Sequence, residues 1–212
     1  MINKIKKILK SILEEGKNSN TDKIVILDSP MATAPEPELR LVGMFCEVVD
    51  EKVAEIVYAI LCLNETNRML PADEKKPIDF YISTYGGNAD DMFALYDIMK
   101  QVEAETEIHT IGVGKVMSAG VPILAAGTKG KRKIGKNCRV MIHSVVAGQH
   151  GPLHNLVNEM QAVEQIQKMY INCLVNETKM TKKDVKNMLE RNLNVYLSAE
   201  EAVKLGIADI IV

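Results

Sequence analysis

Three short stretches of the sequence contain residues that together could perform acyl-transfer chemistry. The stretch "GKVMSAG" holds Ser118 among small and apolar residues, and "VMIHS" holds His143. A serine beside a histidine can act as a nucleophile, because the imidazole can accept the hydroxyl proton. The third stretch, "ISTYGGN", holds Gly86 and Gly87, and glycine can adopt backbone angles that aim amide groups outward. Such amides can stabilise the negative charge that develops on an attacked carbonyl oxygen.

Each of these stretches is expected at the end of a strand. The run "EIHTIGVG" predicts a strand before Ser118, and "SAGVPILAAG" predicts a short helix that begins there. The first amides of a helix lack partners, and the helix dipole favours negative charge beside them. If the three strand ends adjoin, His143 would take the proton from the Ser118 Oγ. The amides of Gly87 and Ala119 would then form the oxyanion hole.

Each stretch also has a plainer interpretation when it is taken alone. A Gly-Gly pair after a strand is more often a turn, and a serine at a helix start is more often a cap. A histidine at the end of a strand is more often structural. The three stretches are therefore informative as a set, and spacing alone does not decide between catalysis and structure.

The elements that must position these residues alternate along the chain from about residue 40 onward. This alternation predicts an α/β fold with a largely parallel sheet. Asn88, Thr181 and Ser198 are expected helix caps, the last in a capping box with Glu201, and Gly206 is expected to end that helix. The pattern predicts strands over 38–48, 78–84, 107–114, 139–143 and 207–212, and helices over 50–65, 89–103, 118–127, 153–175, 181–191 and 198–206.

The composition of the chain excludes several classes of protein and of binding site. With 212 residues, of which 47% are hydrophobic, the chain can bury a sizeable core. The net charge of −2 gives no electrostatic case for nucleic acid binding, and no apolar run approaches the length of a membrane span. The four cysteines are scattered without metal-binding spacing. We therefore expect reduced thiols in a cytoplasmic compartment and no metal site.

The N-terminal region differs in character from the rest of the chain. Residues 2–15 place five apolar side chains on one helical face with lysines between them, and a linker and an irregular, proline-containing segment follow. The helix could bind a membrane surface or a partner, or it could be a docking helix or a removable extension. We expect residues 1–39 to be an N-terminal extension and residues 40–212 to be the compact domain.

Over residues 40–212 the sequence resembles the Clp protease proteolytic subunit family, ClpP. The stretches "GKVMSAGVPILAAGTKGKR" and "RVMIHSVVAGQHG" are similar to the family's serine region, its LLAAG-KGKR run and its VMIH strand. The stretch "YISTYGGNADDMFALYDIMK" resembles the family's YINSPGG strand, turn and helix. The C-terminal stretch "VYLSAEEAVKLGIADIIV" resembles the family's FLSA region. The motifs occur in the family's order and at comparable spacing.

The resemblance implies a fold, a site and an assembly. The fold is the ClpP/crotonase-like spiral of β-β-α units, with a protruding handle helix over residues 153–174. Ser118 is implied as nucleophile and His143 as general base, with Gly87 and Ala119 as the oxyanion hole and Gly86 shaping the turn. The family forms a homo-oligomer of two stacked heptameric rings that hydrolyses unfolded proteins inside a chamber. A separate AAA+ unfoldase uses the ATP, so no cofactor is expected on this chain.

The sequence departs from the family at the third residue of the catalytic triad. The family has an acid two residues before the aromatic of its FLSA motif, and that position here is Asn194. An asparagine oxygen can accept the Nδ1–H of His143, but it brings no negative charge to stabilise the imidazolium. We therefore expect slow intrinsic peptidase activity, or activity that needs a rearrangement or a second type of subunit. Tyr85 also stands where the family usually has proline, although Gly86 and Gly87 should still form the turn.

Three functional hypotheses follow. The first is a serine endopeptidase subunit of an ATP-dependent Clp-type protease. The second is a catalytically weak or inactive subunit that serves the assembly of a mixed barrel, which Asn194 favours. The third is an enzyme of the enoyl-CoA hydratase type, which shares the general fold and also uses backbone oxyanion donors. Those enzymes mostly use pairs of glutamates at the site rather than a serine and a histidine. A test of acyl-CoA binding would distinguish this hypothesis from the other two.

Overall fold

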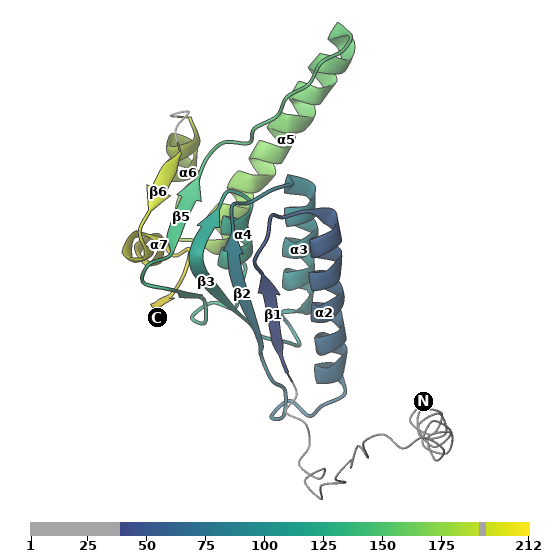
Figure 1. Cartoon of the computed structure of the whole chain (residues 1–212), viewed down its shortest axis with the longest axis vertical. Coiled ribbons are helices and arrows are strands. Elements are labelled where there is room, and N and C mark those ends of the chain that lie inside the picture. The colour runs from purple at the N-terminus through teal and green to yellow at the C-terminus, as the bar shows by residue number, and fades with distance from the viewer. Residues whose placement is uncertain (1–38, 191–193) are drawn as a thin grey trace, which may run out of the picture. The chain divides into compact units, whose positions relative to one another are not determined.

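A largely parallel sheet organises residues 39–190 and 194–212, the part of the chain that this computed structural model describes (Figure 1). Leu39–Val212 forms one compact unit. The helix, linker and irregular segment predicted before residue 39 lie outside the described residues. The strands are β1 Leu41–Met44, β2 Ile78–Thr84, β3 Ile108–Met117, β4 Lys133–Ile134, β5 Arg139–Ile142, β6 Val195–Leu197 and β7 Ile210–Ile211.

The order of the strands confirms the predicted fold class. The sheet runs β1-β2-β3-β4-β7, and β5 pairs with β3 and with β6. Every pair is parallel except β5 with β6, which is antiparallel. The sequence did not predict β4 or β6, because strands of two and three residues are too short to show an alternating pattern.

The helices begin and end close to where the sequence predicts them. The Asn88 side chain accepts hydrogen bonds from two amides at the start of α3, and Thr181 and Ser198 each form a capping box. Gly206 ends α7 in the left-handed conformation, with a φ of 78°. These predicted caps are therefore confirmed. The helices are α2 Asp50–Arg68, α3 Ala89–Val102, α4 Gly120–Ala125, α5 Leu153–Glu177, α6 Lys182–Leu189 and α7 Ala199–Leu205.

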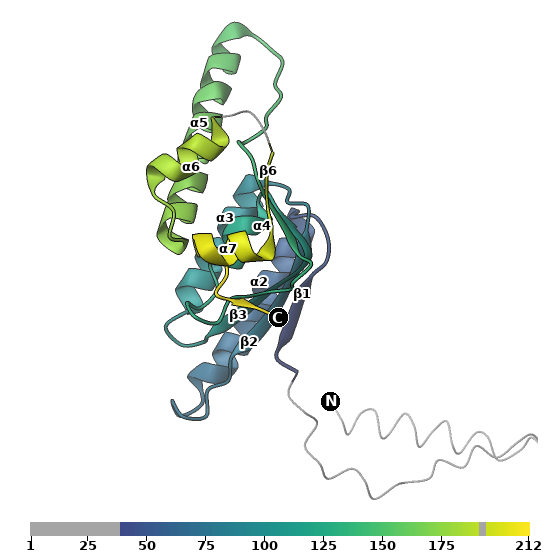
Figure 2. The same cartoon turned by 90° about the vertical axis from the view of Figure 1, so that its left-hand side faces the viewer.

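The core lies between the sheet and the helices α2, α3 and α4, which cover one face of it (Figures 1 and 2). Strand β2 shows how the sequence selects that face, because its residues alternate strictly between buried and partly exposed. Phe80 and Ile82 are completely buried against this layer, as are Leu95 from α3 and Leu124 from α4.

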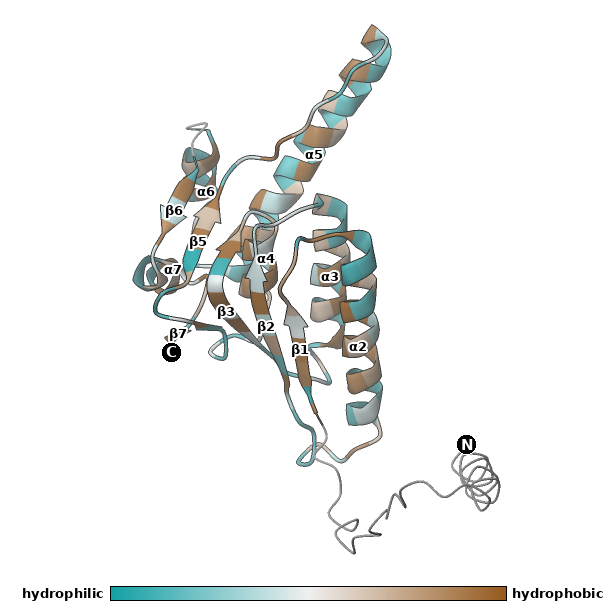
Figure 3. Ribbon diagram, viewed as in Figure 1, coloured by the Kyte–Doolittle hydropathy of each residue, from teal (hydrophilic) through white to brown (hydrophobic). Residues whose placement is uncertain are grey.

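Helix α5 extends well beyond the sheet and its covering helices (Figures 1 and 2). Its C-terminal part packs on the core through Tyr170, Ile171 and Leu174. Its N-terminal part carries apolar residues into solvent, where Leu153 is 71% exposed and Met160 is 66% exposed. Figure 3 shows hydrophobic residues recurring along the whole helix. The predicted apolar stripe is therefore buried over only half of its length in the single chain. Within the described part of the chain, no helix combines the length and the apolar character that crossing a membrane requires.

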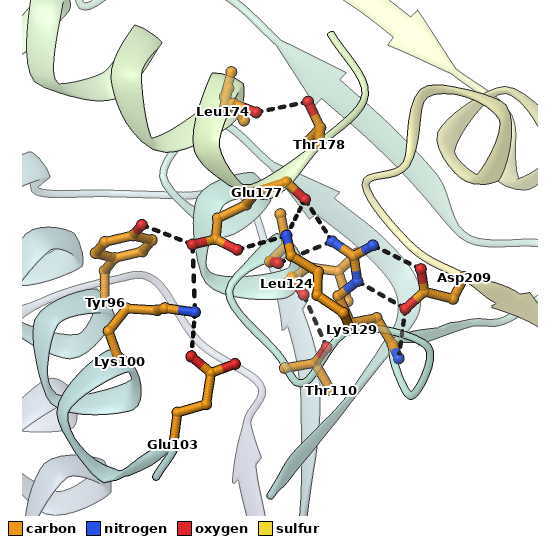
Figure 4. A network of polar contacts seen from close by, with 12 residues as sticks. Tyr96, Lys100, Glu103, Thr110, Leu124, Lys129, Leu174, Glu177, Thr178 and Asp209 are labelled. Carbon is orange, nitrogen blue, oxygen red and sulfur yellow. Dashed lines mark hydrogen bonds and ion pairs between the residues drawn. The ribbon is translucent and has the colours of Figure 1, made fainter.

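A buried polar network holds the C-terminal end of α5 against the sheet (Figure 4). Arg132, which is buried, donates through Nη1 to the backbone oxygen of Glu177 at 2.7 Å and through Nη2 to Asp209 Oδ1 at 2.6 Å. The Glu177 carboxylate accepts from the Tyr96 hydroxyl at 2.8 Å and pairs with Lys129 at 2.6 Å. The network thus joins α3, α5, the loop after α4 and the C-terminal segment.

The two carboxylates of this network have lowered pKa values. Burial acts to raise the pKa of Glu177, but its hydrogen bonds with Lys129 and Tyr96 outweigh burial and bring the pKa below its ordinary value. Burial likewise acts to raise the pKa of Asp209, and the hydrogen bonds from Arg132 and nearby amides lower it overall. Both groups are therefore charged at neutral pH.

Candidate active site

Three parallel strands bring the predicted catalytic residues to one edge of the sheet. Ser118 directly follows Met117, the last residue of β3, and His143 directly follows Ile142, the last residue of β5. These two strands pair in parallel up to Met117 with Met141, so their ends lie side by side. The His143 Nε2 lies 2.8 Å from the Ser118 Oγ. This distance is that of a hydrogen bond through which the imidazole can take the hydroxyl proton.

Ser118 occupies an unusual backbone conformation. Its φ is 53°, and no other non-glycine residue in the described ranges has a positive φ. A non-glycine residue in this region is strained, and such strain is typical of functional sites. The first helical residue of α4 is Gly120, and Ala119 rather than Ser118 occupies the N-cap position without a side-chain cap. The helix therefore begins two residues later than the sequence predicts, and Ser118 does not act as its cap.

Three hydrogen bonds hold this conformation in place. The Ser118 amide donates to the Met141 oxygen at 2.8 Å, and the Ser118 oxygen accepts from the Val121 amide at 3.0 Å. The Tyr170 hydroxyl from α5 also donates to the Ser118 oxygen, at 3.3 Å. Burial raises the pKa of Tyr170, so its hydroxyl remains a donor.

Sequence reasoning missed the contribution of Tyr170. It placed this residue only in the apolar stripe of α5, because the contact joins residues 52 positions apart. The available signal was a hydroxyl on a helical face that is otherwise apolar, since a buried tyrosine hydroxyl usually finds a partner.

The Gly-Gly turn approaches Ser118 as closely as glycine permits. Gly86 and Gly87 have φ values of 101° and 154°. A Cβ at Gly86 would lie 2.6 Å from the Ser118 Cβ, and a Cβ at Gly87 would lie 2.2 Å from the Val48 oxygen. Both separations are too short for a side chain, so both positions require glycine. The predicted turn forms although Tyr85 replaces the family's proline.

Two amides at this turn and at the start of α4 are available to a ligand. Val48 donates to the Gly86 oxygen and accepts from the Asn88 amide, each at 2.8 Å, which leaves the Gly87 amide between them without a partner. Within residues 39–190 and 194–212, neither the Gly87 amide nor the Ala119 amide donates to a protein acceptor. Both residues line the same cavity as Ser118 and His143. This arrangement can hold an oxyanion beside the Ser118 hydroxyl.

The cavity has a volume of ≈ 300 Å³. Its apolar wall comes from α3, α5 and the segment after His143. That segment is tied to α5 because the Val145 amide donates to the Gln167 Oε1 at 2.8 Å. Besides Ser118, His143, Gly87 and Ala119, the lining consists of Asn88, Ala89, Asp90, Met92, Ser144, Val145, Val146, Ala147, Val163, Ile166 and Tyr170.

Asn194 lies next to this pair without a hydrogen bond to it. The antiparallel pairing of β5 with β6 ends at Ile142 with Val195, so His143 and Asn194 occupy the next positions on the two chains. Asn194 is exposed. Among the described residues, the His143 ring has a hydrogen bond with Ser118 alone. The catalytic role of Asn194 therefore stays a prediction.

Comparisons with known proteins identify the family of this chain. The model of the Clp protease family matches residues 39–212. This chain belongs to the Clp protease family. It is 30% identical to the ATP-dependent Clp protease proteolytic subunit 2 of Corynebacterium jeikeium. The 173 aligned residues make up 81% of this chain and 78% of that relative. It is 29% identical to the ATP-dependent Clp protease proteolytic subunit 1 of Prochlorococcus marinus subsp. pastoris. The 172 aligned residues make up 81% of this chain and 83% of that relative.

Membership of the Clp protease family confirms the resemblance seen in the motifs. The proteolytic subunits of this family are serine endopeptidases, and the chain is a ClpP-type peptidase. The match does not favour the hypothesis of an inactive subunit. The matched family is a protease family, not one of enzymes of the enoyl-CoA hydratase type.

Proposed function

We propose that this Clp-type peptidase cleaves peptide bonds with Ser118 as nucleophile and His143 as general base. The observation that carries the proposal is the separation of 2.8 Å between the His143 Nε2 and the Ser118 Oγ. The free amides of Gly87 and Ala119 beside this pair support their role as the oxyanion hole, and the close approach of Gly86 supports its role in shaping the turn.

The reaction follows from these positions. The Nε2 of His143 takes the proton as the Ser118 Oγ forms a bond to the carbonyl carbon, and the resulting oxyanion accepts hydrogen bonds from the two amides. The C–N bond then breaks, and the imidazolium returns the proton to the leaving amine. Water deprotonated by His143 attacks the acyl-enzyme, which releases the second product and restores Ser118.

Asn194 is proposed to orient the imidazole during these steps. When Nε2 accepts the proton of Ser118, the neutral ring carries its own proton on Nδ1, and the Asn194 oxygen could accept it. The position of Asn194 opposite His143 supports this role. An amide brings no full charge, so the proposed site stabilises the imidazolium less than a triad with an acid does.

The proposed substrates are unfolded proteins, cleaved within a homo-oligomer of stacked heptameric rings to which an AAA+ unfoldase delivers them. The exposed apolar half of α5 supports ring assembly, because Leu153, Val157 and Met160 are each about half exposed or more in the single chain. The names of the relatives, which are ATP-dependent proteolytic subunits, support the ATP-using partner.

A cytoplasmic location and an N-terminal extension complete the proposal. Cys46, Cys62, Cys138 and Cys173 are all free thiols, which is usual in a reducing compartment. Residues 1–39 are proposed as an extension to the peptidase domain, because the family match begins at residue 39.

Intact-mass analysis after treatment with a fluorophosphonate tests the proposal. The expected result is a single adduct on the parent protein, none on Ser118→Ala, and hydrolysis of fluorogenic peptides by the parent alone. Both proteins are first checked for the same oligomeric state by light scattering. An assembled parent protein that forms no adduct and cleaves no peptide would overturn the assignment of Ser118.

A further inference from the structure

The cavity beside Ser118 has a wall of mixed polar and apolar character, and one of its lining residues is an aspartate. Met92, Val163 and Ile166 contribute aliphatic surface, and Ser118 and His143 are among the polar residues of the lining. Among the residues that line the cavity, Asp90 is the only one with a carboxylate, and none has an ammonium or guanidinium group. A cavity of this composition suits a ligand with an apolar stem and a cationic end.

Asp90 is held in place by its backbone, which leaves its carboxylate available. It is the second residue of α3, and its amide donates to the Asn88 Oδ1 at 2.7 Å. In the described part of the chain, no ion pair joins Asp90 to a lysine or an arginine. The residue lines the cavity and is exposed, so solvent and substrate can reach it.

The oxyanion hole fixes which part of a substrate meets this wall. A carbonyl oxygen held by the amides of Gly87 and Ala119 places its carbon next to the Ser118 Oγ. Those three residues line the cavity together with Asp90. The cavity is therefore available to the side chain of the residue that supplies the attacked carbonyl.

We propose that this cavity binds that side chain and that Asp90 selects lysine or arginine over neutral residues of similar length. The aliphatic wall would contact the methylene groups, and the Asp90 carboxylate would pair with the cationic end. This inference deepens the proposed function and depends on it, because it assumes that Ser118 attacks the carbonyl.

The neighbouring residue Asp91 offers a matched control. It shares the first turn of α3 with Asp90, and its amide donates to the same Asn88 Oδ1 at 3.1 Å, but it does not line the cavity. Asp90→Asn and Asp91→Asn each remove one negative charge from the same helix end. Neither variant removes the backbone cap, since Asn88 binds main-chain amides. A difference in substrate preference between the two variants is therefore due to the position of Asp90 in the cavity. It cannot be due to the stability of α3 or to the net charge, which change equally in both.

The experiment compares kcat/KM for two peptides that differ only in lysine or norleucine at the residue before the cleaved bond. For the full-length parent we expect the lysine peptide to be preferred. Asp90→Asn should lower the lysine-to-norleucine ratio about three- to fivefold, near the upper end of what a solvent-exposed ion pair contributes. Asp91→Asn should leave this ratio within about twofold of the parent, and raising the salt concentration should lower the parent's ratio because salt screens the pair.

The outcomes separate this proposal from the proposed function. Ser118-dependent cleavage of the norleucine peptide without a preference for lysine would overturn the role of Asp90 and leave the proposed function standing. Equal ratios in Asp90→Asn and Asp91→Asn would also overturn it. An assembled protein that cleaves neither peptide would overturn both.

Discussion

Asn194 lies opposite His143, one position beyond the last pair of the β5–β6 ladder, Ile142 with Val195. An antiparallel pair at such a position has its side chains on the same face of the sheet. The amide of Asn194 therefore lies on the same face as the His143 ring, and it can serve as an acceptor without supplying charge.

Replacing Asn194 with aspartate should raise the turnover number. A carboxylate opposite His143 stabilises the imidazolium that forms when Ser118 loses its proton, and a tenfold change in rate corresponds to about 1.4 kcal/mol. We expect kcat for peptide hydrolysis to rise about tenfold or more in Asn194→Asp. Asn194→Ala, which removes the acceptor, should lower kcat. A fall or no response in Asn194→Asp would contradict this account of the site.

A methyl group at Gly86 should disable the site. The added Cβ would lie 2.6 Å from the Ser118 Cβ, so Ser118 or the turn must move. Since a displacement of about 1 Å can cost about a hundredfold in rate, we expect kcat in Gly86→Ala to fall by about that factor. Gly130→Ala is the matched control, because Gly130 also has a positive φ, of 82°, but has no atom within 4 Å of a Cβ. It should lose only about 1–2 kcal/mol of stability, the usual cost of a side chain in the left-handed conformation. Similar kinetic losses in both variants would argue against the close approach as the cause.

Removing the hydroxyl of Tyr170 should slow catalysis with little effect on KM. The hydroxyl donates to the Ser118 oxygen, which keeps its bond from the Val121 amide when the hydroxyl is lost. Tyr170→Phe should therefore lose about 1 kcal/mol of stability, and kcat and the rate of fluorophosphonate labelling should each fall several-fold. Tyr96→Phe removes a hydroxyl that binds Glu177 instead, so it should lower stability without changing the labelling rate. Equal labelling rates in Tyr170→Phe and the parent would remove Tyr170 from the positioning of Ser118.

The network around Glu177 and Asp209 should make folding stability sensitive to acid. Both carboxyl groups have pKa values below their ordinary ones, despite burial, because of their hydrogen bonds. Their contribution to stability is present above the pKa values of the unfolded chain, about 4, and is lost as the pH falls through the folded values. The free energy of unfolding, measured at fixed protein concentration, should decline below about pH 5.

Substitution of Glu177 tests this source of stability. Glu177→Gln at neutral pH should lose about 2 kcal/mol, since it removes the charge of a buried carboxylate that pairs with Lys129 and accepts from the Tyr96 hydroxyl. The acid decline should also become shallower in this variant. The exposed ion pair of Glu65 with Arg68 gives the control, and Glu65→Gln should change stability by less than about 1 kcal/mol. Unchanged stability across pH 3–7 in the parent would refute the prediction.

Much of the fold could be predicted from short stretches of the sequence. The alternation of β2 and the cap at Asn88 are contained in stretches of seven residues or fewer, and the structure has β2 over Ile78–Thr84 as predicted. The meeting of Ser118 and His143 was a hypothesis that required their two strands to end side by side, and the structure pairs β3 with β5 in that way. Each of these features depends on neighbours in sequence or on one general property of parallel sheets.

Features that depend on distant residues could not be predicted. Strand β6 has three residues and exists because β5 offers it an edge. The bond from Tyr170 to Ser118 and the buried position of Glu177 depend on how α5 packs, which no short stretch encodes. The left-handed backbone of Ser118 is opposed by its own side chain, so the surrounding hydrogen bonds must impose it.

The conformation of Ser118 has a consequence for how this protein could be engineered. A glycine at position 118 would adopt a φ of 53° without strain, so Ser118→Gly should match or exceed the parent in thermal stability while lacking any nucleophile. The proposed nucleophile is then a residue that selection for stability alone would not favour. A serine at this position would therefore be a trade-off between stability and activity, in which the protein is less stable than it could be but has a reactive hydroxyl.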